Sequence, residues 1–475
     1  MSDLVPTPIT VIGAGPAGIM AAHTAAAAGV DVTLIDNNPL PGGQYYRQSP
    51  PEFNFSNSID AVSGRIEGSM VLNRLSHPKI RTLYNTSVWG VFDQHNLALA
   101  DSERSFVLPT DRVILATGAY DRPIAFPGWT LPGILGAGAT LRMIKTQWVL
   151  PGKRILLAGL GPLQLALADA LIKSGAEVVC VAEAANPFRS WQQLPKFWGH
   201  WGRIAEAIAY SYTLRKHRVP LLFNHAIIEA SGKDHVEQAK IARLDAQGAP
   251  ISGTEKQFDV DAICLGYGLL PSFQLAAAFG CKLRLDGCLG WYVPVHDRNM
   301  ESTQPGIFVA GDVTDIAGSK VAIVEGQIAA LNALHQLGII NEKDLAERIV
   351  SLSSELLHLN RLADALQEIY AFRPGLAKLA RDDTLLCRCE EVTFSQVKAA
   401  IANGATDLHQ VKLATRAGMG YCQGRFCSVL IAPLIAEATG KALSDMQPFT
   451  VRPPIQPIPL RVLAAAVTAK ATNED

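Results

Sequence analysis

The sequence lacks several features that would indicate a function directly. It has no Cys-x-x-Cys pair, which excludes a redox centre built on two thiols at that spacing. It has no apolar run as long as a membrane span, and 42 Lys and Arg nearly balance 43 Asp and Glu, for a net charge of −1. That balance gives no reason to expect nucleic acid as a partner.

Hydrolase signatures are missing as well. None of the 11 histidines stands in a Ser/His/acid or metal-hydrolase pattern. A strand pattern starts within about ten residues of Met1, so we expect no signal peptide, a cytoplasmic location and reduced cysteines. With 48% hydrophobic and 18% charged residues, the composition is that of an ordinary globular chain, and 475 residues suffice for two or three domains.

Four of the eight cysteines gather near the C-terminus, as Cys387 and Cys389 in LLCRCEEV and Cys422 and Cys427 in GMGYCQGRFC. Glycines around the second pair let the backbone approach the sulfurs. Four thiolates suit either a 2Fe-2S cluster or a zinc ion. Structural zinc usually uses pairs spaced C-x2-C to C-x4-C, which fits only the second pair. We therefore predict a 2Fe-2S cluster and keep zinc as the alternative.

The chain around these cysteines predicts short helices. VTFSQVKAAIANG begins with a capping box at Thr393 and Gln396 and stops at Gly404, and helical periodicity resumes after Cys427. The cysteines would then lie in two loops of a small helical module. The remaining cysteines, in apolar or strand-like contexts, are interpreted as packing residues: Cys180, Cys264, Cys281 and Cys288.

The N-terminal region carries a dinucleotide-binding fingerprint, PITVIGAGPAGIMAAHTAAAAGVDVTLIDNN. A buried strand at 9–12 leads into a glycine-rich turn and an alanine-rich helix, and a second strand at 32–35 ends at Asp36, which can hold a ribose hydroxyl. FAD and NAD both use this fingerprint. The turn predicted to hold the pyrophosphate consists of Gly13, Gly15, Pro16, Ala17 and Gly18.

Two later segments resemble the flavin-contacting segments of two-dinucleotide-domain flavoproteins. In each, a hydrophobic strand runs directly into a short turn, and the resemblance implies that the dinucleotide is FAD. It further implies that Asp312 binds the ribityl chain and that the following helix points its N-terminus at the pyrimidine side of the flavin. The two turns comprise Ala116, Thr117 and Gly118 in the first segment and Gly311 and Asp312 in the second.

Two further positions match the same family. Gly43 and Gln44, in PLPGGQYYR, lie where a loop runs along the cofactor in that family. An ordinary Pro-Gly turn would have the same sequence pattern. Val88 occupies the strand that commonly contacts adenine through its backbone. Both are predicted FAD contacts.

A second βαβ unit, KRILLAGLGPLQLALADALIKSGAEVVCVAEAAN, lies between the flavin segments. Gly159 and Gly161 open its helix, and Glu183 ends its second strand in the place of a ribose-binding acid. Gln164 stands where the third glycine should pack against the sheet. We expect the fold to survive this change, and we leave open whether the site holds a nucleotide, NAD or ATP, or is vestigial.

The remaining segments complete the predicted organisation. The aromatic stretch 188–201 is expected to pack in the core or at an interface, and the Pro-rich stretch 452–460 is expected to be an extended arm. The predicted domains are 1–122 with 284–338 for FAD, 123–283 for a second nucleotide, 339–380 as a helical connection, 381–446 as the cysteine module and 447–475 as an arm and tail.

The order of these motifs, from the FAD fingerprint and TGAYDRP to CRCEEVT, GMGYCQGRFC and RPPIQPIPL, resembles one family over nearly the whole chain. This family is the α (A) subunit of heteromeric dye-linked amino-acid dehydrogenases, the group of opine oxidase, D-hydroxyproline dehydrogenase and hydrogen cyanide synthase. The resemblance implies an α/β fold, a two-dinucleotide-binding-domain flavoprotein with a C-terminal helical 2Fe-2S module of the BFD type.

The resemblance also implies an oxidoreductase subunit that transfers electrons. A partner β subunit with its own FAD would oxidise the C–N bond of an amino acid or opine, such as octopine, nopaline or D-hydroxyproline. Electrons would pass through flavin, with an FMN at the subunit interface, and the 2Fe-2S cluster to a quinone-type acceptor. A small ferredoxin-like γ subunit and a place on the inner face of the membrane are further implications.

Two alternatives remain open at this point. One is a self-sufficient NAD(P)H-dependent reductase that uses the second βαβ unit, and the other is a zinc-held docking scaffold. No residue is predicted to be catalytic, because the amine substrate would be oxidised in the partner chain.

Overall fold

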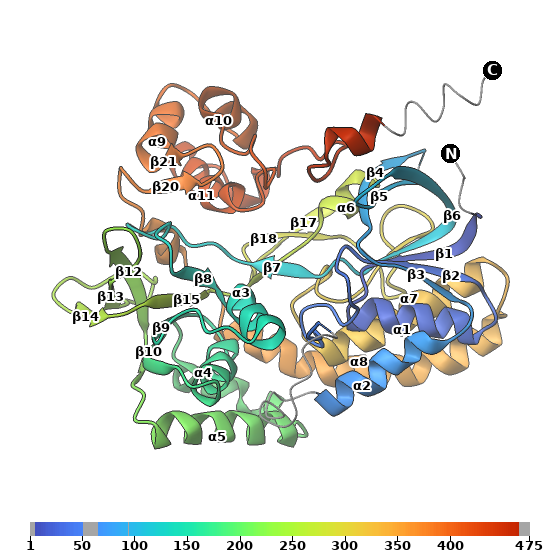
Figure 1. Cartoon of the computed structure of the whole chain (residues 1–475), viewed down its shortest axis with the longest axis horizontal. Helices are drawn as coiled ribbons and strands as arrows, with labels where there is room; N and C mark the ends of the chain where they lie inside the picture. The colour runs from blue at the N-terminus through green and yellow to red at the C-terminus, as the bar shows by residue number, and fades with distance from the viewer. Residues whose placement is uncertain (1–4, 51–64, 94, 465–475) are drawn as a thin grey trace.

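The computed structural model describes residues 5–50, 65–93 and 95–464. Figure 1 shows three parts: a first α/β domain on the right, a second α/β domain on the left, and a small helical module above them. The chain leaves the first domain after its central strand, builds the second domain, and returns. The last residues of the described chain run back from the helical module to the first domain.

The first domain is built on a seven-stranded sheet of order β3-β2-β1-β6-β5-β4, with β19 paired to β6. The fingerprint strands β1 and β2 are parallel, whereas β4, β5 and the first half of β6 form an antiparallel meander. The strands are β1 (Thr7–Ile12), β2 (Val32–Ile35), β3 (Ile80–Leu83), β4 (Ser87–Phe92), β5 (Asn96–Ala100), β6 (Ser105–Leu115) and β19 (Ile307–Val309).

Four helices accompany this sheet: α1 (Pro16–Ala27), α2 (Arg65–Leu72), α7 (Ser319–Gln336) and α8 (Glu342–Ile369). Helices α1 and α7 touch along small residues, and a side chain at Gly326 would overlap the backbone of Ala17. The segment predicted as a helical connection, 339–380, is not one continuous helix, because α8 ends at Ile369 and Pro374 starts a separate 3₁₀ turn.

The second domain contains a five-stranded parallel sheet of order β11-β10-β9-β15-β8. Its strands are β8 (Ile134–Gly136), β9 (Arg154–Gly159), β10 (Glu177–Glu183), β11 (Leu221–Phe223) and β15 (Ala262–Gly266). Its helices are α3 (Ala137–Arg142), α4 (Leu163–Lys173) and α5 (Trp201–Lys216), and β12 (His225–Ser231), β13 (Gln238–Arg243) and β14 (Lys256–Asp259) form an antiparallel sheet beside them.

Two short strands carry the chain between the domains. Strand β7 (Ala119–Asp121) leaves the first domain, and β16 (Leu269–Pro271) returns antiparallel to it. The returning chain forms α6 (Gln274–Ala278) and the hairpin of β17 (Leu283–Asp286) and β18 (Trp291–Pro294) before it reaches β19. The chain thus returns from the second domain to the first through β15 and β16.

The C-terminal module consists of β20 (Leu385–Cys387), β21 (Val392–Thr393), α9 (Phe394–Ala402), α10 (Leu408–Thr415) and α11 (Cys427–Thr439). The predicted capping box is present, with the Thr393 and Gln396 side chains each accepting the other residue's backbone N–H, and Gly404 follows the helix with φ +101°. Beyond the module, the predicted arm is confirmed: Ile455 is buried against the first domain and donates its N–H to the carbonyl of Trp89 at 2.7 Å.

The structure excludes one of the two positions predicted for the aromatic stretch, which is packing in the core. Phe188, Trp191, Trp198 and Trp201 expose 77%, 67%, 72% and 58% of their surface, so packing in the core is wrong for these residues. Apolar composition alone did not show whether these side chains are buried or exposed. Within the described residues, no helix is long and apolar enough to cross a membrane.

Candidate functional site

A cavity of about 2330 Å³ lies where the three parts of the molecule meet. Most of the predicted FAD residues line it: Gly13, Gly15, Pro16, Ala17, Asp36, Gly43, Gln44, Val88, Ala116, Thr117, Gly118, Gly311 and Asp312. The same cavity reaches Gly161 of the second βαβ unit and Arg388, Arg425 and Phe426 of the C-terminal module. Gly18, also predicted in the turn that holds the pyrophosphate, lies outside the lining and packs against the backbone of Gly13.

The glycine turn is built to bring a ligand close to the backbone. A side chain at Gly13 would overlap the carbonyl of Ala116, and one at Gly18 would overlap the carbonyl of Gly13. At Gly15, by contrast, an added Cβ would meet only the Cα of Gly43, at 3.9 Å. Gly15 is the N-cap of α1, and no side chain caps that helix. The free N–H groups and the open space fit a pyrophosphate.

Asp36 is held in place by the same turn. Its Oδ2 accepts the N–H of Ala14 at 2.6 Å, and its Oδ1 accepts the N–H of Asn38 at 2.7 Å. The carboxylate is 8% exposed and lines the cavity beside β4. Its position at the end of β2 agrees with the predicted contact to a ribose hydroxyl.

The opposite end of the predicted FAD site lies at the N-terminus of α7. Asp312 lines the cavity there, and burial raises its pKa to about 6. Glu325, inside α7, accepts the N–H of Gly311 at 2.7 Å and the hydroxyl of Thr314 at 3.1 Å. Burial raises the pKa of Glu325 to about 8, so this carboxyl is mainly protonated at neutral pH.

Glu325 was not among the predicted site residues. The signal was present, because Glu325 is an isolated acid in the apolar run VAIVEGQIAA. Such an acid has to find hydrogen-bond donors when its helix is buried. Here it fixes Gly311, which has φ +79°, and so shapes the turn that carries Asp312.

The second βαβ unit has the expected fold, but only some of its predicted nucleotide-binding residues line the cavity. Gln164 fills the third-glycine position, where its Nε2 donates to the carbonyl of Gly266 at 3.0 Å; side chains at Gly159 or Gly266 would overlap it. Glu183 accepts the N–H of Gly161 at 3.1 Å, but neither Glu183 nor Gly159 lines the cavity. Burial raises the pKa of Glu183 to about 8.

The four C-terminal cysteines lie as two pairs. Cys387 pairs with Cys427, and the hydrogen bond from Cys427 together with the backbone N–H groups of Gly418, Glu390 and Cys389 lowers the pKa of Cys387 to about 5. Cys389 lies beside Cys422, and burial raises its pKa. Among the described residues, no group of three or more Cys, His, Asp and Glu is placed to hold a metal ion. Two thiolates for each of two irons is the ligand pattern of a 2Fe-2S cluster.

Glycines shape the loop that carries the second pair. A side chain at Gly420 would overlap Cys389, which places the two cysteine loops in direct contact. Gly418 and Gly424 have φ +89° and +82°, and the ring of Phe449 packs against both. The expected close approach of backbone to sulfur is therefore present at Cys387, which receives the N–H of Gly418.

Strand β7 connects the cavity to this loop. The Tyr120 hydroxyl donates to the carbonyl of Arg425 at 3.3 Å, and the rings of Tyr120 and Phe426 lie 6.0 Å apart. Arg122 is 6% exposed, donates to the carbonyl of Leu289, and lies 4.5 Å from the ring centre of Phe372. Burial lowers the pKa of Arg122 to about 10, so it stays a cation.

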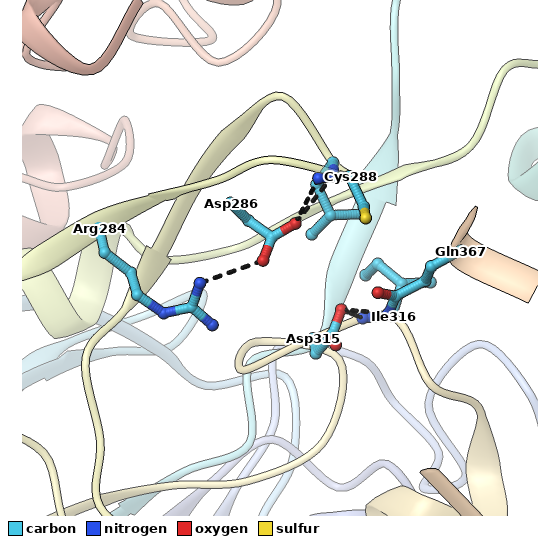
Figure 2. Close-up of polar contacts among 7 residues, drawn as sticks. Arg284, Asp286, Cys288, Asp315, Ile316 and Gln367 are labelled. Carbon is cyan, nitrogen blue, oxygen red and sulfur yellow. Dashed lines mark hydrogen bonds and ion pairs between the residues drawn. The ribbon is translucent and has the colours of Figure 1, made fainter. Parts of the chain in front are cut away.

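Figure 2 shows a polar cluster, of which Cys288, Ile316 and Gln367 line the cavity. Asp286 accepts from the N–H of Cys288 at 3.0 Å and pairs with Arg284 at 3.1 Å, while Asp315 accepts from Gln367 at 2.6 Å. Burial and the nearby carboxylates raise the pKa of the Cys288 thiol. Cys288 lines the cavity and is partly exposed, which the interpretation as a packing residue missed.

The comparisons with known proteins agree with this geometry. Residues 7–333 match the pyridine nucleotide-disulphide oxidoreductase family, and residues 382–467 match the sarcosine oxidase A3 domain. The A subunit of opine oxidase from Agrobacterium tumefaciens is 31% identical, across 96% of this chain and 91% of its own. The HcnB subunit of hydrogen cyanide synthase from Pseudomonas aeruginosa is 30% identical, across 94% of this chain and 96% of its own.

A solved structure shares the fold along the whole length. L-proline dehydrogenase from P. horikoshii aligns with a TM-score of 0.69 and 22% identity, covering 97% of this chain and 80% of that one. The fold and site thus define a flavin oxidoreductase with two nucleotide-binding-type domains, and the predicted fold class is confirmed. The chain belongs to the pyridine nucleotide-disulphide oxidoreductase family, which implies FAD, and to the same group as HcnB and the A subunit of opine oxidase.

Proposed function

We propose that this chain is the electron-transfer subunit of a heteromeric dehydrogenase that oxidises the C–N bond of an amino acid or opine. The observation that carries the proposal is the contact between the cavity and the cysteine loops, made by Tyr120 with Arg425 and Phe426. One end of the cavity fits FAD, and the other reaches the loops of four cysteines. FAD accepts two electrons together and releases them singly, which suits a cluster that takes one at a time.

Each residue has a defined task in this proposal. The N-terminus of α1 at Gly15 holds the pyrophosphate, Asp36 the ribose, and Asp312 the ribityl chain. The N-terminus of α7 lies in the cavity lining at Gly318 and Ser319, where a helix dipole favours negative charge on the ring system. The cysteine pairs would hold a 2Fe-2S cluster.

The names of the relatives support the presence of other subunits. The opine oxidase chain and HcnB are both named as subunits, which supports a heteromeric complex. We propose a β subunit with its own FAD as the site of amine oxidation, an FMN at the interface, a ferredoxin-like γ subunit, and a quinone-type acceptor. An opine or D-hydroxyproline is the substrate class we propose, and the cytoplasm or the inner face of the membrane is the proposed location.

The test is analysis of the anaerobically purified chain for iron, acid-labile sulfide, zinc and released flavin, with a low-temperature EPR spectrum after dithionite. We expect FAD together with about two irons and two sulfides per chain and the signal of a reduced 2Fe-2S cluster. Zinc without sulfide would favour a docking scaffold instead. Absence of flavin would contradict the proposed site at Gly15.

A self-sufficient NAD(P)H-dependent reductase is a second candidate, because Gly161 of the second βαβ unit lines the cavity. Three features count against it: Gln164 fills the third-glycine position, Glu183 lies outside the cavity lining, and the Tyr370 ring lies next to Gly161. We therefore expect no bleaching of the flavin absorbance when NADH or NADPH is added anaerobically. Rapid bleaching would establish this candidate.

A further inference from the structure

We propose that helix α5 and the turns before it form a surface that binds lipid bilayers containing anionic headgroups. The apolar residues of this surface, called here the aromatic face, are Phe188, Trp191, Leu194, Trp198, Trp201, Ile208 and Tyr212, all at least 58% exposed. Trp198 and Trp201 do not line the cavity, whereas the other five also border it. The proposal does not depend on any cofactor of the chain. It concerns the stretch that the sequence analysis assigned to the core or to an interface.

Helix α5 is unusual in how little of it is covered. Among its 16 residues only Leu214 is buried. Trp201, Ala205, Ile208 and Tyr212 are spaced i, i+4, i+7 and i+11, so at about 100° per residue they form one stripe along the helix. Leu214 lies on the opposite side. The stripe is exposed, whereas the covered or partly covered residues of the helix lie on other sides: Arg203, Ile204, Glu206, Tyr210, Thr213 and Leu214.

The charge of this region favours a negatively charged partner. Residues 186–220 contain six Lys and Arg but a single acid, Glu206, for a net charge of +5 in a chain whose total is −1. Glu206 is paired with Arg203 at 2.9 Å. Arg215, Lys216 and Arg218 are exposed at the end of the helix. Cations beside an apolar stripe are attracted to anionic lipid headgroups.

The residue types of the aromatic face suit a membrane surface. Trp and Tyr concentrate at the boundary between acyl chains and water, because each has an apolar ring and a polar atom. Three of the chain's seven tryptophans belong to the aromatic face. A helix lying in the boundary needs no apolar run long enough to span the bilayer. Figure 1 places α5 at the outer edge of the second domain, on the side away from the C-terminal module, so that the cysteine loops stay in water.

The experiment measures binding of the purified full-length chain to vesicles by flotation. Neutral phosphatidylcholine vesicles are compared with vesicles containing phosphatidylglycerol. We expect binding to the anionic vesicles, with a partition coefficient that falls about fivefold for each of Lys216→Gln and Arg218→Gln at low salt. High salt should weaken binding further because it screens the headgroups. Equal binding to both lipids, or none to either, would overturn the proposal.

Variants of the aromatic face identify the residues involved. Trp201→Ser with Ile208→Ser should remove at least nine-tenths of the binding, whereas Leu413→Ser with Tyr421→Ser, equally exposed on the C-terminal module, should leave it unchanged. Quenching of wild-type tryptophan fluorescence by brominated lipids gives a readout that does not depend on the folding of a variant. If the wild-type chain instead forms dimers that Trp201→Ser and Ile208→Ser dissociate, without binding vesicles, the surface is a protein interface and the proposal is wrong.

Discussion

At the scale of single residues, the glycine turn separates packing from ligand binding. Gly13 and Gly18 are required by the protein itself, since side chains there would overlap backbone carbonyls. Gly15 has φ −79° and ψ −177°, which any residue adopts, and its missing side chain leaves space inside the cavity. We therefore predict that the need for glycine at position 15 comes from the ligand and not from the fold.

This difference predicts the effect of Gly15→Val. The variant should lose most of its bound FAD, because the side chain fills the space for the pyrophosphate, while the free energy of unfolding of the apoprotein stays within about 1 kcal/mol of wild type. Flavin content and urea denaturation of the apoproteins measure the two quantities. Gly202→Ala, where a Cβ meets no atom within 4 Å, is the control. Full flavin content in Gly15→Val would show that the site is misassigned.

The buried carboxyl group of Glu325 should make the stability of the protein depend on pH. Its folded pKa, about 8, lies above the ordinary value of 4.5, so the folded state keeps a proton that the unfolded state releases. Stability from this group is therefore greatest below pH 4.5 and declines as the pH rises towards 8, by on the order of a few kcal/mol. Glu325→Gln should lessen this decline in urea midpoints between pH 5 and pH 8. An identical decline in the variant would refute the assignment.

At the scale of elements, the two cysteine loops act as one unit. Cys422→Ser should abolish the proposed cluster and leave FAD bound, because no residue of the cysteine loops touches the glycine turn in the described contacts. Iron, sulfide and flavin analysis measure this. Cys288→Ser, on the cavity wall, is the matched control and should keep both cofactors. A reducible cluster in Cys422→Ser would exclude this residue as a ligand.

From the contacts of β7 we predict that the cavity and the C-terminal module are mechanically coupled. Tyr120→Phe removes the hydrogen bond to Arg425 but keeps the ring, and should cost about 1 kcal/mol. We expect faster hydrogen exchange in residues 418–427, with FAD content unchanged. Tyr421→Phe alters an exposed hydroxyl on the same loop and should have no effect. Unchanged exchange in Tyr120→Phe would mean that the loop holds its position without β7.

Much of the organisation could be predicted from sequence, because it depends on local requirements. The strand, glycine turn, helix and terminal acid around Gly15 are consecutive, and the capping box at Thr393 involves residues three apart. The contact of Tyr120 with Arg425 joins residues 305 apart, and no local pattern indicates it. The exposed apolar stripe on α5 could not be predicted either, because the hydrophobicity of a helix does not show which of its sides packs against the protein.

At the scale of the whole molecule, the cavity makes cofactor binding a determinant of stability. Because its lining comes from both α/β domains and the C-terminal module, FAD should stabilise the assembled chain and not one domain alone. At a free FAD concentration of about one hundred times Kd, stabilisation of about 2.7 kcal/mol is expected. Calorimetry of apo and FAD-loaded protein should show a higher transition temperature. A shift confined to one of two separate transitions would contradict this.

Strand β7 has one more consequence. Its residues Tyr120 and Asp121 and the next residue, Arg122, contact, in turn, the cysteine loop, the N-terminus of α3 through Gly138, and the β17–β18 turn through Leu289. Neighbouring residues of a strand point to opposite sides, so Tyr120 and Asp121 hold β7 from both faces, and Arg122 holds the residue that follows it. These three bonds tie the C-terminal module, the second domain and the β17–β18 hairpin to one short connecting segment, and we expect these parts to move together.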